Sequence, residues 1–292
     1  MRAAVAAGAD AVYFGCAAGF NARARASNFE LRELSEVTAF AHARGVECYM
    51  CVNVLAYDEE LLEAGRLIRR AYESGVDAII VQDVGVAALA RRVAPGLSVH
   101  ASTQMSVTDG AGARFAEQLG CETVVVGREL SISEIARVAA EVRPETYIEA
   151  FVHGALCVSY SGQCLSSESW GGRSANRGQC AQQCRLPYAV MKDGVELKGF
   201  ERSYALSPQD LAGVDKAVEL IAAGVGTFKI EGRLKGEEYV YTTTSAYRHA
   251  IDAACAQLEL EPRRRRAAVA LPPPTRDELL QVFWHRPTRG RD

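Results

Sequence analysis

The stretch FAEQLGCETVVVGRE, residues 115–129, joins the end of a helical pattern to a short apolar run through Gly120. A glycine that closes a helix just before a buried apolar strand is typical of the connections in a parallel α/β sheet. The same design recurs at residues 3–15, 69–83 and 218–232. This recurring unit predicts an α/β fold built from repeated strand and helix pairs.

Three further apolar runs, at 47–56, 97–103 and 147–154, bring the predicted strands to seven. Most are separated by an amphipathic helix, such as the one expected within 58–75. No glycine-rich dinucleotide-binding motif follows any strand, which favours a (β/α)8 TIM-like barrel over a doubly wound sheet. The sequence opens directly on a helical pattern, so we expect the barrel to lack its first strand.

About 70 residues separate His153 from the last predicted strand, more than an ordinary connection needs. We therefore expect a cysteine-rich insertion before that strand, with a cysteine loop at 154–188 and a further insertion at 189–217. In the latter, Asp193 and Gly194 predict a hairpin turn, and Ser207 followed by proline predicts a helix start. Residues 1–255 should form the barrel, and 256–292 a linker and tail that contain the arginine run 263–266.

Composition limits the class of protein. With 49% hydrophobic and 24% charged residues, the 292-residue chain can build a substantial core. No apolar run reaches the roughly 18 residues that span a bilayer, and the start lacks a signal-peptide layout, so we expect a cytoplasmic protein without membrane insertion. The net charge of -3 predicts no overall nucleic-acid surface, although the arginine run and Arg173, Arg177 and Arg185 could meet phosphates.

Four of the nine cysteines, Cys157, Cys164, Cys180 and Cys184, follow the spacing C-x6-C-x15-C-x3-C. An odd cysteine count in a reducing compartment argues against a disulfide framework. Zinc sites normally use paired C-x2–4-C knuckles, so zinc remains an alternative, whereas iron–sulfur clusters tolerate irregular spacing and are favoured. A thiol nucleophile paired with His153 would leave three thiols unexplained.

Polar residues at the carboxyl ends of the predicted strands are candidates for chemistry, because active sites of barrels lie at that face. Any one of them could instead form a structural salt bridge. The candidate catalytic residues are His100, Glu149, His153, Lys229 and Glu231. The candidate substrate-binding residues are Thr103, Gln104, Arg128, Glu129, Arg177 and Arg233.

The segment EAFVHGALCVSYSGQCLSS, residues 149–167, resembles the signature of the collagenase-like peptidase family, peptidase family U32. Other hallmark segments of that family are similar to HASTQMSV (100–107), RSANRGQCAQQCRLPY (173–188), YALSPQDL (204–211) and KIEGRLKGEEYV (229–240). The resemblance extends from residue 3 to about residue 255. Relatives usually begin with a strand before the first helix, and those acting on RNA continue into a further domain, so the tail is expected to be truncated relative to them.

The resemblance implies an iron–sulfur-dependent hydroxylation factor that acts on RNA or on a small aromatic substrate, or else a peptidase. Better understood members act without molecular oxygen on a tRNA wobble uridine, an rRNA cytidine or ubiquinone precursors. The ubiquinone members carry [4Fe-4S] clusters, and prephenate is implicated in the RNA reactions. The four cysteines 157, 164, 180 and 184 are thereby implied as cluster ligands, with prephenate as candidate co-substrate. Such chemistry needs a cofactor, because amino-acid side chains do not run it unaided.

Two alternatives remain. One is a collagenase-like peptidase, that is, a hydrolase of unassigned catalytic type, although no H-E-x-x-H or G-x-S-x-G motif is present. The other is a non-catalytic scaffold whose cysteines hold a structural metal. The expected partners are tRNA or rRNA, a small-molecule carboxylate, and further subunits in a homo- or hetero-oligomer.

Overall fold

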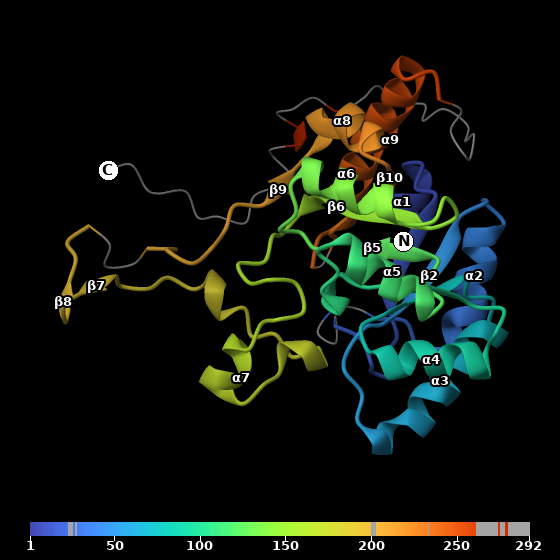
Figure 1. Cartoon of the computed structure of the whole chain (residues 1–292), viewed down its shortest axis with the longest axis horizontal. Helices are drawn as coiled ribbons and strands as arrows, with labels where there is room; N and C mark the ends of the chain where they lie inside the picture. The colour runs from blue at the N-terminus through green and yellow to red at the C-terminus, as the bar shows by residue number, and fades with distance from the viewer. Residues whose placement is uncertain are drawn as a thin grey trace.

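Seven parallel strands form the centre of the structure, a computed structural model that describes residues 1–22, 26, 28–199, 203–232, 234–260, 274 and 278–279 (Figure 1). All seven strands predicted from the sequence are confirmed. In sheet order they are β1 (Ala11–Gly15), β2 (Glu47–Val52), β3 (Ala78–Val81), β4 (Ser98–Ala101), β5 (Thr123–Val125), β6 (Tyr147–Gly154) and β10 (Val225–Ile230).

The sheet is a curled half-barrel, so a full (β/α)8 barrel is not confirmed; the sequence predicted such a barrel without its first strand. β1 and β10 stand at the two ends of the strand order and do not pair, and the described residues supply no eighth parallel strand between them. One side chain connects these edges: the Tyr13 hydroxyl donates a hydrogen bond of 3.2 Å to the carbonyl of Ile230. The carboxyl ends of the strands still meet at one face, as in a barrel.

Helices follow the strands and cover the outer face of the sheet (Figure 1). Four of them end at the glycines that the repeat predicted, since Gly8, Gly75, Gly120 and Gly224 all have positive φ, between 82° and 90°. The helices are α1 (Arg2–Ala6), α2 (Leu34–His42), α3 (Leu61–Glu73), α4 (Val84–Val93), α5 (Gly110–Gln118), α6 (Ile132–Glu141), α7 (Ser166–Gly171), α8 (Ala217–Ala222) and α9 (Glu237–Gln257).

Side-chain caps fix where several of these helices begin. Asp83 accepts from the backbone N–H groups of Gly85 and Val86 at the start of α4. Ser131 and Glu134 form a capping box at the start of α6. Because each cap lies directly after a strand or its loop, it sets the direction in which the chain leaves the face where the strands end.

The core lies between the sheet and these helices. All four residues of β3 are buried, and they pack with residues of α3 and α4 such as Ile68 and Val86, which are both fully inaccessible. Burial on both faces explains why this strand is a continuous apolar run. Across the described residues, no helix combines the length and the apolar character needed to cross a membrane.

The long connection between β6 and β10 contains α7, a hairpin of β7 (Met191–Lys192) and β8 (Val195–Glu196), and β9 (Leu211–Ala212). The hairpin turns at Asp193 and Gly194, as predicted, and extends away from the sheet (Figure 1). β9 returns to pair antiparallel with the end of β6.

The predicted helix start at Ser207 is wrong, because α8 begins only at Ala217. The Ser207 hydroxyl instead accepts a hydrogen bond of 3.0 Å from Arg185. Most of the predicted tail, including the arginine run 263–266, lies outside the described residues.

Candidate functional site

A cavity of about 800 Å³ opens at the carboxyl ends of the strands. One wall belongs to the sheet and its loops, with Tyr13, Asn53, Gln104 and Lys229 among its residues. The opposite wall belongs to residues 154–188, which we call the cysteine segment. The cavity therefore lies where the fold predicts chemistry, between the strand ends and the four clustered thiols.

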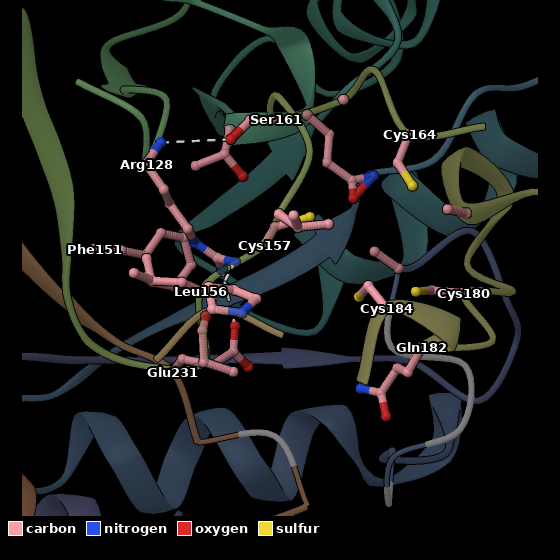
Figure 2. Close-up of a pocket in the computed structure, with 18 of the residues that line it drawn as sticks. Arg128, Phe151, Leu156, Cys157, Ser161, Cys164, Cys180, Gln182, Cys184 and Glu231 are labelled. Carbon is pink, nitrogen blue, oxygen red and sulfur yellow. Dashed lines mark hydrogen bonds and ion pairs between the residues drawn. The ribbon is translucent and has the colours of Figure 1, made fainter. Parts of the chain in front are cut away.

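The thiols of Cys157, Cys164, Cys180 and Cys184 all line this cavity (Figure 2). Cys157 is exposed, and the other three are partly buried. Burial raises the pKa of Cys184, and negative charge on Cys157 adds to this effect, so these groups lie close enough to influence one another. Among the described residues, no three His, Cys, Asp or Glu side chains are arranged to hold a metal ion as they stand.

Arg177 fastens the cysteine segment to the loop after β2. Its guanidinium donates two hydrogen bonds of 2.6 Å to the Glu60 carboxylate and one of 2.7 Å to the carbonyl of Leu55. The bonds from Arg177, followed by one from the backbone N–H of Tyr57, lower the pKa of Glu60 to about 2. The predicted substrate-binding residue Arg177 is thus engaged in a structural clamp and does not line the cavity.

Arg185 fastens the same segment on its other side. It donates to the Ser207 hydroxyl at 3.0 Å, to the carbonyl of Pro208 at 2.8 Å and to the carbonyl of Leu156 at 2.5 Å. Together, Arg177 and Arg185 attach the loop that carries the thiols to two separate parts of the chain.

Two glycines allow the cysteine segment to approach the sheet loops closely. Gly162 has φ of +78°, and a Cβ there would collide with the carbonyl oxygen of Gln104. Gly178 has φ of +76°, and its Cβ would collide with the carbonyl oxygen of Asn21. Both positions combine a left-handed backbone with direct backbone contact, so only glycine fits without movement.

Arg128 lies inside the cavity between the two walls. Its guanidinium stacks on the Phe151 ring, 3.8 Å from the ring centre, and donates a hydrogen bond of 3.1 Å to Glu231. Figure 2 shows this group beside Cys157. The neighbouring Glu129 does not line the cavity, because its carboxylate accepts hydrogen bonds from the backbone N–H and hydroxyl of Ser161.

Lys229 and Glu149 form an ion pair inside the curled sheet, with 2.5 Å between Nζ and Oε1. Their side chains are only 7% and 2% exposed, so each charge depends on the other for compensation. The Lys229 ammonium also lies 4.3 Å from the centre of the Tyr13 ring. His100 is buried near this pair, and desolvation lowers the pKa of its imidazole, which keeps it neutral near pH 7.

His153 packs against α9. Its Nδ1 lies 3.2 Å from the Tyr247 hydroxyl, and burial, followed by the charge of Lys235, lowers its pKa to about 4. Cys157 lines the cavity and His153 does not, so the structure does not bring the two together as a nucleophile and its base. The reason is a register shift in the pairing of β6 with β10, where Ile230 pairs with His153 directly after the Lys229–Phe151 pair.

The predicted site residues fall into three sets: those that line the cavity, those that do not, and one residue outside the described part of the chain. Those lining the cavity are Thr103, Gln104, Arg128, Lys229 and Glu231, together with the four cysteines. Those that do not line it are His100, Glu129, Glu149, His153 and Arg177. Arg233 lies outside the described residues.

Sequence reasoning missed several polar residues of the site. Asn53 and Gln82 follow β2 and β3 directly, and this position at a strand end was a usable signal. Asn176 lies within the cysteine segment, where the cysteines alone drew attention. Glu60 offered no local signal, because its partner Arg177 is 117 residues away along the chain.

Comparison with known proteins gives a family model and several relatives. The model described as Peptidase family U32 matches residues 1–290. The chain is 43% identical over 252 residues to a 23S rRNA 5-hydroxycytidine synthase of Escherichia coli, covering 86% of this chain and 37% of that protein. It is 38% identical over 264 residues to tRNA hydroxylation protein P1 of Bacillus subtilis, covering 89% and 62%.

A Collagenase of Porphyromonas gingivalis is 39% identical over 267 residues, covering 87% of this chain and 63% of that protein. The chain thus spans less than two thirds of the length of each of these three relatives. The solved structure of the U32 peptidase Mk0906 aligns with a TM-score of 0.46 at 16% identity, over 69% of this chain and 83% of that chain.

Proposed function

The chain belongs to peptidase family U32, and from this premise we propose that it takes part in hydroxylating a pyrimidine base of tRNA or rRNA. Relatives that are 43% and 38% identical are named for hydroxycytidine synthesis in 23S rRNA and for tRNA hydroxylation. The observation that carries the proposal is the cavity itself, which has four thiols on one wall and polar strand ends on the other. Oxidative chemistry on a base needs a redox group next to a base-sized site.

The cofactor in this proposal is a [4Fe-4S] cluster held by Cys157, Cys164, Cys180 and Cys184. Four cysteine thiols form a suitable donor set, and all four face one cavity. When bound, the cluster would supply one-electron transfer beside the substrate.

The residues around the thiols would hold the segment and the substrates. Arg177 and Arg185 fix the segment that carries the ligands. Arg128 and Lys229 place two cations at the cavity wall, which suits the proposed small carboxylate co-substrate, such as prephenate. In this arrangement the Glu149 carboxylate lies beside the Lys229 ammonium and compensates its charge.

The cysteine segment also carries exposed groups of the kinds that bind single-stranded nucleic acid in other proteins. Tyr160 and Trp170 are 70% and 57% exposed, and Arg173 is exposed on the same segment. Aromatic rings stack on bases and arginines pair with phosphates. With a net charge of -3 overall, the chain would depend on such local groups to bind RNA.

Anaerobic purification followed by iron and acid-labile sulfide analysis tests the cofactor. We expect iron, sulfide and visible absorption in the wild-type chain, and their loss in the Cys180→Ala variant. Cys255→Ala is the matched control, because Cys255 lies on α9, away from the cavity. Zinc without sulfide would identify the alternative metal, and iron that persists in Cys180→Ala would contradict the ligand assignment.

Nucleoside mass spectrometry tests the reaction. RNA from a host that lacks its own hydroxylation proteins would be digested with and without expression of this chain. We expect a pyrimidine nucleoside heavier by one oxygen atom only when the wild-type chain is expressed. An unchanged nucleoside profile from cells containing cluster-loaded protein would rule out this function.

Peptide hydrolysis is the second candidate, because a relative 39% identical is named Collagenase. Digestion of soluble collagen by the wild-type chain and by a variant with all four segment cysteines replaced tests it. Equal cleavage by both proteins would place peptidase activity elsewhere than at the thiols, and no cleavage by either would reject this candidate.

A further inference from the structure

Three amide side chains form a hydrogen-bonded row between the two walls of the cavity. The Gln104 side-chain NH2 group donates to the backbone carbonyl of Asn53 and to the side-chain oxygen of Gln82, both at 3.1 Å. The Gln82 NH2 group in turn donates to the side-chain oxygen of Asn176 at 3.5 Å. The row thus runs from a strand-end loop of the sheet to the cysteine segment.

The backbone carbonyl of Asn53 sets the orientation of every amide in this row. A carbonyl can only accept, so the NH2 group of Gln104 must face it. Gln82 then presents its oxygen to Gln104 and its NH2 group to Asn176. Within the described part of the chain, this leaves the Gln104 Oε1 atom as an unused acceptor and the Asn176 Nδ2 atom as an unused donor.

The two unused groups belong to residues that line the cavity. Gln104 and Asn176 are both part of its wall, whereas Gln82 is only 5% exposed and lies behind them. Hydrogen bonds to their backbone groups hold both end residues of the row in place. The Ser102 hydroxyl accepts from the backbone N–H of Gln104 at 3.2 Å, and the carbonyl of Asn176 accepts from the N–H of Leu55 at 3.0 Å.

We propose that Gln104 and Asn176 read the base that enters this cavity, with Gln104 Oε1 accepting from a base N–H and Asn176 Nδ2 donating to a base oxygen or ring nitrogen. Gln82 is a positioning residue that keeps both amides in this orientation. The inference rests on the proposed function, and it adds two groups that contact the edge of the base.

The chemistry of the base edge supports this assignment. Phosphate contacts position a nucleic acid but carry no sequence information, so selection depends on hydrogen bonds to base edges. A pyrimidine presents an N–H donor next to an acceptor: N3–H beside O4 or O2 in uracil, and the N4 amino group beside N3 in cytosine. The fixed acceptor of Gln104 matches the N–H of such an edge. The fixed donor of Asn176, at the other end of the row, matches a base oxygen or ring nitrogen that lies apart from it, whereas a freely rotating amide would present either atom.

Anisotropy titrations of the full chain test the proposal with two probes. One probe is a fluorescein-labelled single-stranded RNA of uridines, and the other is the same RNA with 3-methyluridine, in which the N3–H donor is blocked. We expect the methyl group to weaken binding about five- to tenfold in the wild-type chain and less than about twofold in Gln104→Met, which has already lost the acceptor. Gln163→Met is the control, because Gln163 lies on the cysteine segment, is exposed and does not line the cavity; it should keep the full methyl penalty.

Gln82→Met provides a second readout that leaves the cavity wall intact. With the central amide removed, Gln104 can rotate, so we expect the methyl penalty to shrink although uridine RNA still binds. An equal penalty in the wild-type, Gln104→Met and Gln82→Met chains would overturn the proposal, since the methyl group would then act only through its bulk. Equal binding of both probes by the wild-type chain would also overturn the proposal, although RNA binding itself would stand. If the wild-type chain bound neither probe, both the proposal and the RNA function would be rejected.

Discussion

Lys229 and Glu149 show how the polar interior of the curled sheet depends on single side chains. Their ion pair lies away from solvent, and the Lys229 ammonium also faces the ring of Tyr13. A buried pair of this kind adds little stability compared with apolar residues. Loss of one partner, however, leaves the other charge buried without compensation. The pair therefore keeps a cation at the cavity wall at a fixed position.

Glu149→Gln should destabilise the chain by about 3 kcal/mol, because the Lys229 ammonium would stay buried without its carboxylate. Urea unfolding of Glu149→Gln, Lys229→Met and the Glu149→Gln/Lys229→Met double variant measures this. The double variant should lose much less unfolding free energy than the two single variants lose in sum. Lys216→Met is the control, since its pair with Glu219 is exposed and should matter little. Additive losses in the double variant would contradict the coupling.

The clamp between Glu60 and Arg177 should give a pH-dependent contribution to stability. Because Arg177 lowers the pKa of Glu60 to about 2, the stabilisation is present above the ordinary value of 4.5 and is lost as pH falls from 4.5 towards 2. We expect Glu60→Gln to cost at most about 1 kcal/mol at pH 7, since the pair is partly exposed. The difference in unfolding free energy from the wild-type chain should shrink between pH 5 and pH 3. A difference that stays constant with pH would exclude the clamp as its cause.

At the scale of elements, the cysteine segment contacts the sheet loops through its glycines. Gly162→Ala should weaken uridine RNA binding and protection of the segment from proteolysis, because the new methyl group would push it off the carbonyl of Gln104. Gly172→Ala is a matched control: its φ of +65° imposes similar backbone strain, but its Cβ would meet nothing within 4 Å. The two variants should therefore differ in binding more than in stability. If both behave alike, strain alone explains the effect.

Elements were easier to predict from this sequence than their junctions. The seven strands were visible because each is a short apolar run, and in four of them the run follows a helix-ending glycine, a signal contained within about fifteen residues. The helix expected at Ser207 failed because a distant guanidinium, that of Arg185, takes the hydroxyl that would have capped it. His153 was expected in the site because it lies at the end of a predicted strand, four residues before Cys157. The register shift beside Phe151 changes the alternation of side chains there.

The four cysteines were found from spacing alone, since they are close in sequence as well as in space. Asn53, Gln82 and Asn176 come from three separate segments, and no local pattern reports that they meet. More of the residues at strand ends could have been named as site candidates, because the fold class fixes the face on which they lie. Contacts across the cavity depend on how the long connection folds back, which the sequence does not specify locally.

At the scale of the whole molecule, the gap between β1 and β10 is crossed by the Tyr13 side chain and by the helices outside it. Arg248 of α9 is nearly buried and pairs with Asp10, at 2.9 Å, in the turn between α1 and β1. This pair joins the first and last parts of the sheet on the outside, while Tyr13 joins them on the inside. The half-barrel thus keeps its curvature without a complete ring of strands.

Tyr13→Phe should cost about 1 kcal/mol of unfolding free energy, because it removes the hydrogen bond to Ile230 but keeps the ring beside Lys229. Amide hydrogen exchange should accelerate in β10 more than in β3, which lies in the middle of the sheet. Tyr160→Phe, at a 70% exposed position, is the control and should leave both measurements unchanged. If amide exchange accelerated equally in all strands, the hydroxyl would not act mainly at the edge of the sheet.

The order of the strands also bears on how the chain acquires its shape during synthesis. From β1 to β6 each strand pairs with the one made just before it, so every new strand meets an edge that is already complete. Only the pairing of β6 with β10 waits for the long cysteine-bearing connection to emerge from the ribosome. Short-range pairing of this kind favours fast assembly. The part of the cavity wall that β1 to β6 supply can therefore form first, and the thiols are then delivered onto it before β10 adds Lys229.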